Sequence, residues 1–147
     1  MDISKSVTIN APATAVWDLL TDPEKVKIWN TSFVGSEPIS EGEIRAGFRS
    51  KTTLQEGGKE VVFDEEIQQF DPPETFRLSI GGGNLGKHPM NVAFHLRQDG
   101  SETVTTSRCT WAPSGIFLRL IAPLITRMAR KTLDDQLTRL KALAEAT

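Results

Sequence analysis

The sequence has very few residues of the kinds that build disulfides or metal sites: one cysteine, two histidines and no tyrosine in 147 residues. A lone Cys109 excludes an internal disulfide and fits a reducing compartment, so we expect a cytoplasmic protein. Zinc sites generally need three or four well-spaced ligands, and His88, His95 and Cys109 offer no such spacing. We therefore expect no metal and no cofactor.

The chain also lacks an excess of charge and a long apolar run. Lys plus Arg number 17 and Asp plus Glu number 19, so the net charge of −2 gives no reason to expect a nucleic-acid partner. The longest apolar stretch, Ile116 to Ile125, contains Arg119 and is shorter than the roughly 20 residues of a membrane helix. The N-terminus has no basic region followed by an apolar run, so we expect neither a signal peptide nor a membrane span.

The residues that are present are those of an ordinary globular domain. Hydrophobic residues make up 38% and charged residues 24%, which excludes a disordered or fibrous chain. A length of 147 residues is typical of one domain. We therefore predict a single ligand-binding domain over residues 1–147 and leave its oligomeric state open.

The first 30 residues indicate a strand and two short helices. Ile3, Val7 and Ile9 alternate with polar residues, which is the pattern of a half-buried strand. Pro12 and then Pro23 suit first helical positions, where the missing N–H costs nothing. Two short helices are therefore expected before the chain reaches about residue 30.

The middle of the chain predicts an antiparallel meander. Apolar and polar residues alternate in segments separated by turn residues, and Asp99-Gly100 is the strongest hairpin signal. Phe76, Leu78 and Ile80 share one strand face, so one side of the sheet is apolar. The expected strands cover residues 33–39, 46–54, 60–70, 75–80, 90–98 and 102–111.

The last third predicts one long amphipathic helix from about Ser114. Its expected inward stripe is Ile121, Leu124, Ile125, Met128, Thr132, Gln136, Leu137, Leu140 and Leu143. A twisted sheet of seven strands curls, and a straight helix laid across its concave side leaves a gap. The predicted fold is therefore α+β, with two short helices after the first strand and a long C-terminal helix closing a cavity against a curved seven-stranded antiparallel sheet.

Several segments resemble a known superfamily. The opening Asn10–Pro12, Val16–Glu24 and Trp29 is similar to that of the START-like helix-grip proteins, the SRPBCC group of polyketide cyclases, dehydrases and lipid-transport proteins. Further likenesses are Gly47–Arg49, Phe70–Glu74 and Gly100–Thr105. The resemblance covers nearly the whole chain and implies a helix-grip fold with a tendency to hold hydrophobic ligands. It does not imply a reaction, because these motifs shape the backbone.

The candidate site consists of residues expected to face the cavity. The apolar strand faces and the helix stripe supply most of them, and Glu65 joins them if its strand face points inward, where a carboxyl needs a polar partner. Thr132 and Gln136 are polar members of the helix stripe. No catalytic residue is assigned. The predicted cavity lining is Phe48, Phe63, Glu65, Leu78, Ile80, Val92, Phe94, Trp111, Ile125, Met128, Thr132 and Gln136.

Three functions remain open from the sequence. Binding or carriage of a small hydrophobic molecule is favoured, because a cavity is predicted and no catalytic triad or phosphate loop is present. A cyclase or dehydratase acting on an apolar polyketide-type intermediate would need only one or two acid–base groups, such as His88 or Glu65. A cochaperone-like interaction module is the third. In the first two cases the glycine-rich segment Gly81–Pro89 is the expected entry to the cavity.

Overall fold

The protein is described by a computed structural model that covers residues 1–83, 85 and 88–146. Seven strands form one antiparallel sheet in the order β1-β7-β6-β5-β4-β3-β2. The strands are β1 (Asp2–Ile9), β2 (Phe33–Pro38), β3 (Arg49–Glu56), β4 (Lys59–Asp71), β5 (Thr75–Gly81), β6 (Met90–Asp99) and β7 (Glu102–Thr110).

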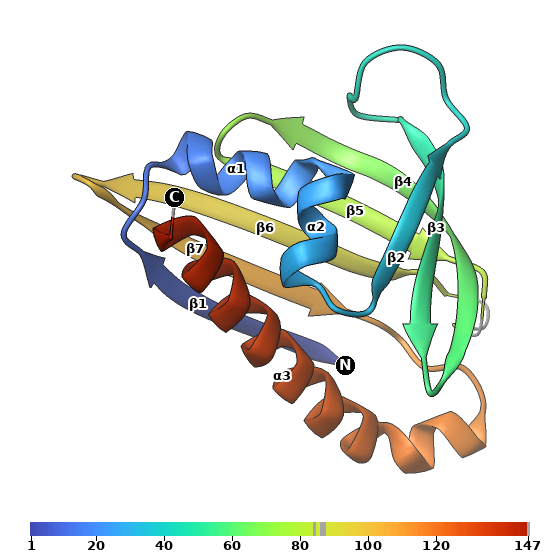
Figure 1. Ribbon diagram of the computed structural model, residues 1–147. Coiled ribbons are helices and arrows are strands. Elements are labelled where there is room, and N and C mark those ends of the chain that lie inside the picture. Colours follow the sequence, from blue (N-terminus) through green and yellow to red (C-terminus); the bar gives the residue numbers. More distant parts are fainter. Residues whose placement is uncertain (84, 86–87, 147) are drawn as a thin grey trace.

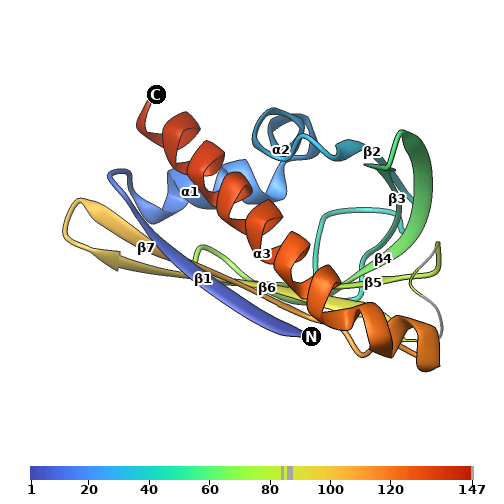
Figure 2. The same cartoon turned by 90° about the horizontal axis from the view of Figure 1, so that it is seen from below.

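The helices lie on one side of this sheet. They are α1 (Ala13–Thr21), α2 (Pro23–Trp29) and α3 (Ile116–Glu145). Figure 1 shows α3 running along the β1 edge while α1 and α2 cross β5 and β6. Figure 2 shows the sheet curving so that β2 and β3 rise beside the helices. This arrangement confirms the predicted helix-grip fold.

Most strand boundaries agree with the sequence pattern, and one differs for a clear reason. The strand expected to begin at residue 46 begins at Arg49. Gly47 has a φ of +87°, a left-handed backbone that interrupts an extended strand. Its N–H still donates to the carbonyl of Ile67 on β4 at 2.7 Å, so the segment stays attached to the sheet.

The buried side chains form two clusters. The larger one joins β1, α1, α2 and the end of α3, and includes Ile9, Val16 and Leu140, each 0% exposed. The smaller one lies around Phe63 and Trp111 and includes Ile80 and Leu85. A sheet that curls cannot be filled evenly by one straight helix, so the packing concentrates in two places.

The inward face of α3 differs from the predicted stripe. Leu124 and Met128 are 58% and 63% exposed, so their assignment to the core is wrong. The buried residues of the helix are Leu133, Leu137, Leu140 and Ala144, all in its second half. Pro123 lies inside the helix, and Figure 1 shows the first turns of α3 at an angle to the rest. Many apolar residues in residues 116–128 face outward, and periodicity alone could not show which apolar face is covered.

Candidate functional site

A cavity of about 370 Å³ lies between the sheet and the helices. This volume falls in the range of roughly 300–1,000 Å³ that small-molecule sites occupy. Its wall includes members of both apolar clusters, such as Phe94 and Leu133 of the larger one and Ile80 of the smaller one. The cavity therefore occupies the space that the two clusters leave between them.

Seven of the twelve predicted site residues are in the wall of this cavity. The strands contribute apolar side chains with one carboxyl, and α3 contributes two polar side chains. Register explains the grouping, because Leu78 pairs with Val92 and Ile80 pairs with Glu65 across neighbouring strands. Ligand binding by these residues stays a prediction. The seven are Glu65, Leu78, Ile80, Val92, Phe94, Thr132 and Gln136.

Three of the predicted residues fill the clusters beside the cavity. Phe48 is buried in the larger cluster, with the Arg45 guanidinium carbon 5.7 Å from its ring centroid. Phe63 is covered by Gly83, where an added Cβ would come within 2.6 Å of the ring. Trp111 is 9% exposed, and its indole N–H donates to the Leu85 carbonyl at 3.2 Å.

The remaining two predicted residues belong to the first half of α3. Ile125 packs against the smaller cluster, and Met128 is directed outward. The expected cavity lining is therefore corrected at Phe48, Phe63, Trp111, Ile125 and Met128. The common reason is that sheet curvature and helix rotation decide whether an apolar side chain meets packed neighbours or an open space.

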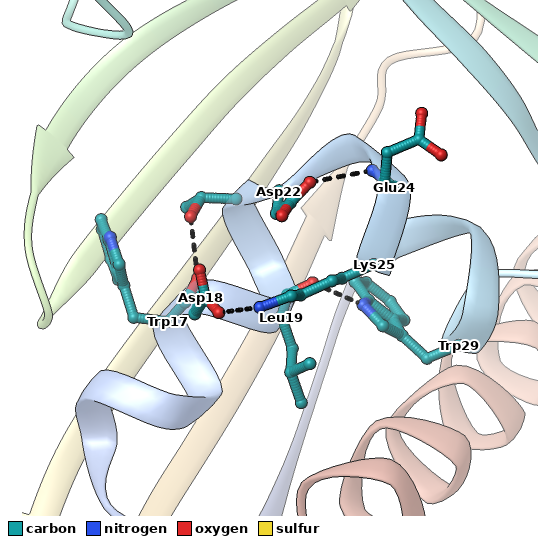
Figure 3. A network of polar contacts seen from close by, with 8 residues as sticks. Trp17, Asp18, Leu19, Asp22, Glu24, Lys25 and Trp29 are labelled. Carbon is teal, nitrogen blue, oxygen red and sulfur yellow. Dashed lines mark hydrogen bonds and ion pairs between the residues drawn. The ribbon is translucent and has the colours of Figure 1, made fainter.

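Trp29, at the end of α2, is held in the cavity wall by its own hydrogen bond. Its indole nitrogen Nε1 donates to the carbonyl of Leu19 at 2.7 Å, and its ring meets Phe94 edge to face at 6.4 Å. Asp22 caps α2 by accepting from the N–H of Glu24 at 3.0 Å. Figure 3 shows the two hydrogen bonds, from Trp29 to Leu19 and from Glu24 to Asp22, together at the α1–α2 corner. The corner thus fixes the position of one large aromatic wall residue.

Polar contacts fasten α3 to the connection between α2 and β2. The Gln136 amide nitrogen donates to Asn30 Oδ1 at 3.2 Å, and the same oxygen accepts from the backbone N–H of Ser32. Arg139 donates to the hydroxyl of Thr31 at 3.1 Å. Asn30, Ser32 and Gln136 all line the cavity. These bonds therefore hold the cover of the cavity in place.

Two carboxyls belong to the cavity wall, and Glu65 is half-buried whereas Glu56 is exposed. Burial raises the pKa of the Glu65 carboxyl above the ordinary 4.5, and the nearby Thr52 hydroxyl lowers it by a smaller amount. Thr52 is 2% exposed, and its Oγ1 has no hydrogen-bond partner of regular geometry among the described residues. A polar pair inside an apolar wall can orient a ligand by hydrogen bonding.

Cys109 and the two histidines are the other side chains that could react with a ligand, and they differ in whether they reach the cavity. Cys109 lines the cavity, and burial raises the pKa of its thiol to about 11, which leaves it a poor nucleophile at neutral pH. His88 and His95 are exposed and are not part of the wall. In residues 1–83, 85 and 88–146, no three His, Cys, Asp or Glu side chains gather as metal ligands. Acid–base chemistry in the cavity would therefore depend on Glu65 rather than His88.

The exposed residues of the cavity wall lie on other elements than Gly81–Pro89, the segment that the sequence predicted as the entry. Pro23 on α2, Glu56 on β3 and Thr132 on α3 are the exposed members of the wall, so the opening lies among these elements. The described residues of Gly81–Pro89 do not line the cavity. Asn84, Gly86 and Lys87, which belong to the expected entry, lie outside the described residues.

Sequence reasoning missed several wall residues. Ala129 and Leu133 line the cavity together with Thr132 and Gln136. The signal was available, because these four positions lie within two turns and share one helix face. Thr52 is a further wall residue, and a threonine on a strand gives no sequence sign that its hydroxyl faces a cavity.

No helix in the described part of the chain is long and apolar enough to cross a membrane.

Comparison with solved structures identifies the same fold over almost the whole chain. TTHA0849 from Thermus thermophilus has a TM-score of 0.80 at 20% identity, with 99% of this chain and 98% of that chain covered. A START superfamily protein from Mycobacterium smegmatis has a TM-score of 0.76 at 15% identity, covering 99% and 97%. NE0264 from Nitrosomonas europaea has a TM-score of 0.75 at 16% identity, covering 97% and 93%. At these identities the likeness shows the fold alone.

Sequence comparison supplies the family. Curated proteins gave no match to this chain. Residues 1–145 match the family described as polyketide cyclase / dehydrase and lipid transport, which is nearly the full length. With the helix-grip fold and the cavity beneath α3, the chain belongs to the polyketide cyclase/dehydrase and lipid transport family.

Proposed function

We propose that the domain binds and carries a small, mainly apolar molecule in the cavity between the sheet and α3. The observation that carries this proposal is the cavity itself, about 370 Å³ in volume and walled largely by side chains such as Leu78, Val92 and Leu133. Transfer of apolar surface from water into such a wall is favourable by about 25 cal/mol per Å². Family membership supports a hydrophobic ligand.

The polar groups of the wall restrict the chemistry of the ligand. Among the described residues, no Lys, Arg or His lines the cavity, so a ligand carboxylate or phosphate would be buried without a cation. Glu65 would repel such an anion further when ionised. A hydroxyl or carbonyl group, in contrast, can bond to Glu65 and to the neighbouring Thr52 hydroxyl. The ligand we propose is therefore neutral, with an apolar body and one or two polar atoms.

Filling the cavity tests this proposal. Ala129→Trp places an indole in the wall, and Ala142→Trp adds the same group to an exposed position of the same helix. A neutral naphthylamine dye, whose fluorescence rises in apolar surroundings, should bind to wild type and to Ala142→Trp. It should bind at least about tenfold more weakly to Ala129→Trp, because the space is occupied. Equal affinity for both folded variants would mean that the dye, and by inference the ligand, does not use this cavity.

Glu65 gives a specific reason to keep a second candidate, a dehydratase or cyclase of apolar carbonyl compounds. A carboxyl whose pKa is raised by burial keeps its proton to a higher pH than an ordinary glutamate does, which is the direction that a general acid needs. The test is loss of water from an apolar β-hydroxy ketone, followed by the absorbance of the conjugated product. Enzymatic turnover should disappear in Glu65→Gln while dye binding persists. No turnover by wild type above the background rate would leave binding as the function.

A further inference from the structure

The first half of α3 exposes an apolar face. Of the ten large hydrophobic side chains that are exposed in the described part of the chain, five belong to residues 116–128. Successive helical residues are rotated by about 100°, so these five share one side of the helix. We call this set the outer stripe: Ile116, Phe117, Leu120, Leu124 and Met128, which are 58% to 79% exposed.

The opposite side of the same turns is already packed. Leu118 and Ile125 lie against the smaller cluster around Phe63 and Trp111. The first half of α3 is therefore held to the body of the protein through its inner side. The outer stripe is left facing away from its own fold, and apolar patches of this kind mark surfaces that contact other molecules.

Charge distinguishes the surroundings of the outer stripe from the rest of the molecule. Residues 116–131 contain four basic residues and no acidic one, although the chain as a whole carries a net charge of −2. Arg119, Arg127 and Arg130 line a shallow hollow beside the stripe, and Lys131 is exposed one turn after Arg127. An apolar stripe flanked by arginines matches a partner with apolar material below an anionic surface.

We propose that the outer stripe docks this domain on the surface of an anionic lipid bilayer. The apolar side chains enter the boundary of the acyl chains, and the neighbouring guanidinium groups contact lipid phosphates. A second copy of the chain fits less well, because a symmetric contact through this face would bring four cations of each copy together.

The docking surface is continuous with the cavity. Met128 ends the outer stripe, and Thr132, one turn later, is an exposed residue of the cavity wall. A domain docked through the first half of α3 therefore brings the opening of the cavity near the lipid, where apolar cargo is dissolved. The transfer of cargo rests on the function proposed above, whereas docking does not require an occupied cavity.

Flotation with vesicles tests the docking. Wild type should float with vesicles of phosphatidylcholine and phosphatidylglycerol, should float much less with phosphatidylcholine alone, and should be released by high salt. Arg127→Glu/Lys131→Glu and Phe117→Ser/Leu120→Ser should each reduce the partition onto anionic vesicles by at least about tenfold. The matched controls Arg97→Glu and Ile28→Ser, at exposed positions on β6 and α2, should partition like wild type.

A local reporter shows whether the stripe itself touches lipid. Phe117→Trp should show an additional fluorescence blue shift on anionic vesicles, relative to wild type with its three tryptophans. Equal partition of the stripe variants and wild type would overturn the proposal. A second result would also overturn it: wild type does not float with vesicles but sediments as a dimer, and Phe117→Ser/Leu120→Ser dissociates that dimer. The outer stripe would then bind a second copy of the chain instead of lipid. Dye binding in the cavity is measured without vesicles, so either proposal can fail alone.

Discussion

The two halves of α3 use apolar side chains in opposite ways. In residues 132–145, Leu137 and Leu140 are buried against the body of the protein. In residues 116–131, Leu120 and Leu124 are exposed. Both halves would be called amphipathic from their sequence, so an apolar stripe shows that a helix has a partner without showing whether the partner is its own sheet. The second half covers the cavity, and the first half offers a surface to another molecule.

Stability should separate the two halves most strongly. Leu140→Ala removes a fully buried side chain and should lower the free energy of unfolding by about 2–5 kcal/mol. Leu124→Ala, at a 58% exposed position, should change it by less than about 0.5 kcal/mol. Denaturant titration of the two variants measures both values. Similar losses for the two leucines would mean that the first half of α3 is packed as tightly as the second.

The reactivity of cysteine thiols should differ between the cavity wall and the outer stripe of α3. The pKa of Cys109 is raised from the usual 9.0 to about 11, so its thiolate should be about a hundredfold scarcer at pH 8 than that of an exposed cysteine. Iodoacetamide should therefore modify native Cys109 slowly and the denatured protein quickly. Met128→Cys in a Cys109→Ser background should react quickly without denaturant. Rapid alkylation of native Cys109 would contradict its burial.

Two adjacent carboxyls on β4 extend the comparison to smaller effects. The pKa of Glu65 is raised by burial, whereas Lys51 holds the pKa of the exposed Asp64 below its usual value. Burial makes Glu65 harder to ionise in the folded protein than in the unfolded protein. Its ionisation therefore lowers the free energy of unfolding as the pH rises above 4.5, and this loss is complete once the pH exceeds the raised pKa. Glu65→Gln should accordingly raise the melting temperature at neutral pH, and the gain should vanish as the pH falls towards 4.5.

Asp64→Asn is the matched control for that measurement. The lowered pKa of Asp64 stabilises the fold above pH 3.8, so its removal should leave the melting temperature unchanged or slightly lower at neutral pH. A rise of equal size in both variants would show that the effect is general to this strand and not due to burial of Glu65.

The sequence was a good guide to the elements and a poorer one to the site. Strands such as Phe33–Pro38 and Met90–Asp99 match their expected ranges closely, because alternation and turn residues are local properties. Phe63 and Trp111 were expected in the cavity wall and are packed beside it, because only the curvature of the assembled sheet decides where space remains. The same limit applies to Met128, which lies in a segment where most sides of the helix are apolar.

Nuclear Overhauser effects between a bound apolar dye and the protein's methyl groups show directly whether the cavity is the ligand site. We expect contacts from the dye to Leu78, Val92 and Leu133, which line the cavity, and none to Leu124 or Met128 on the outer stripe. Contacts to Leu124 and Met128 with none to Leu78 would contradict this expectation, because the dye would then bind to the outside of α3 and the cavity would have no ligand.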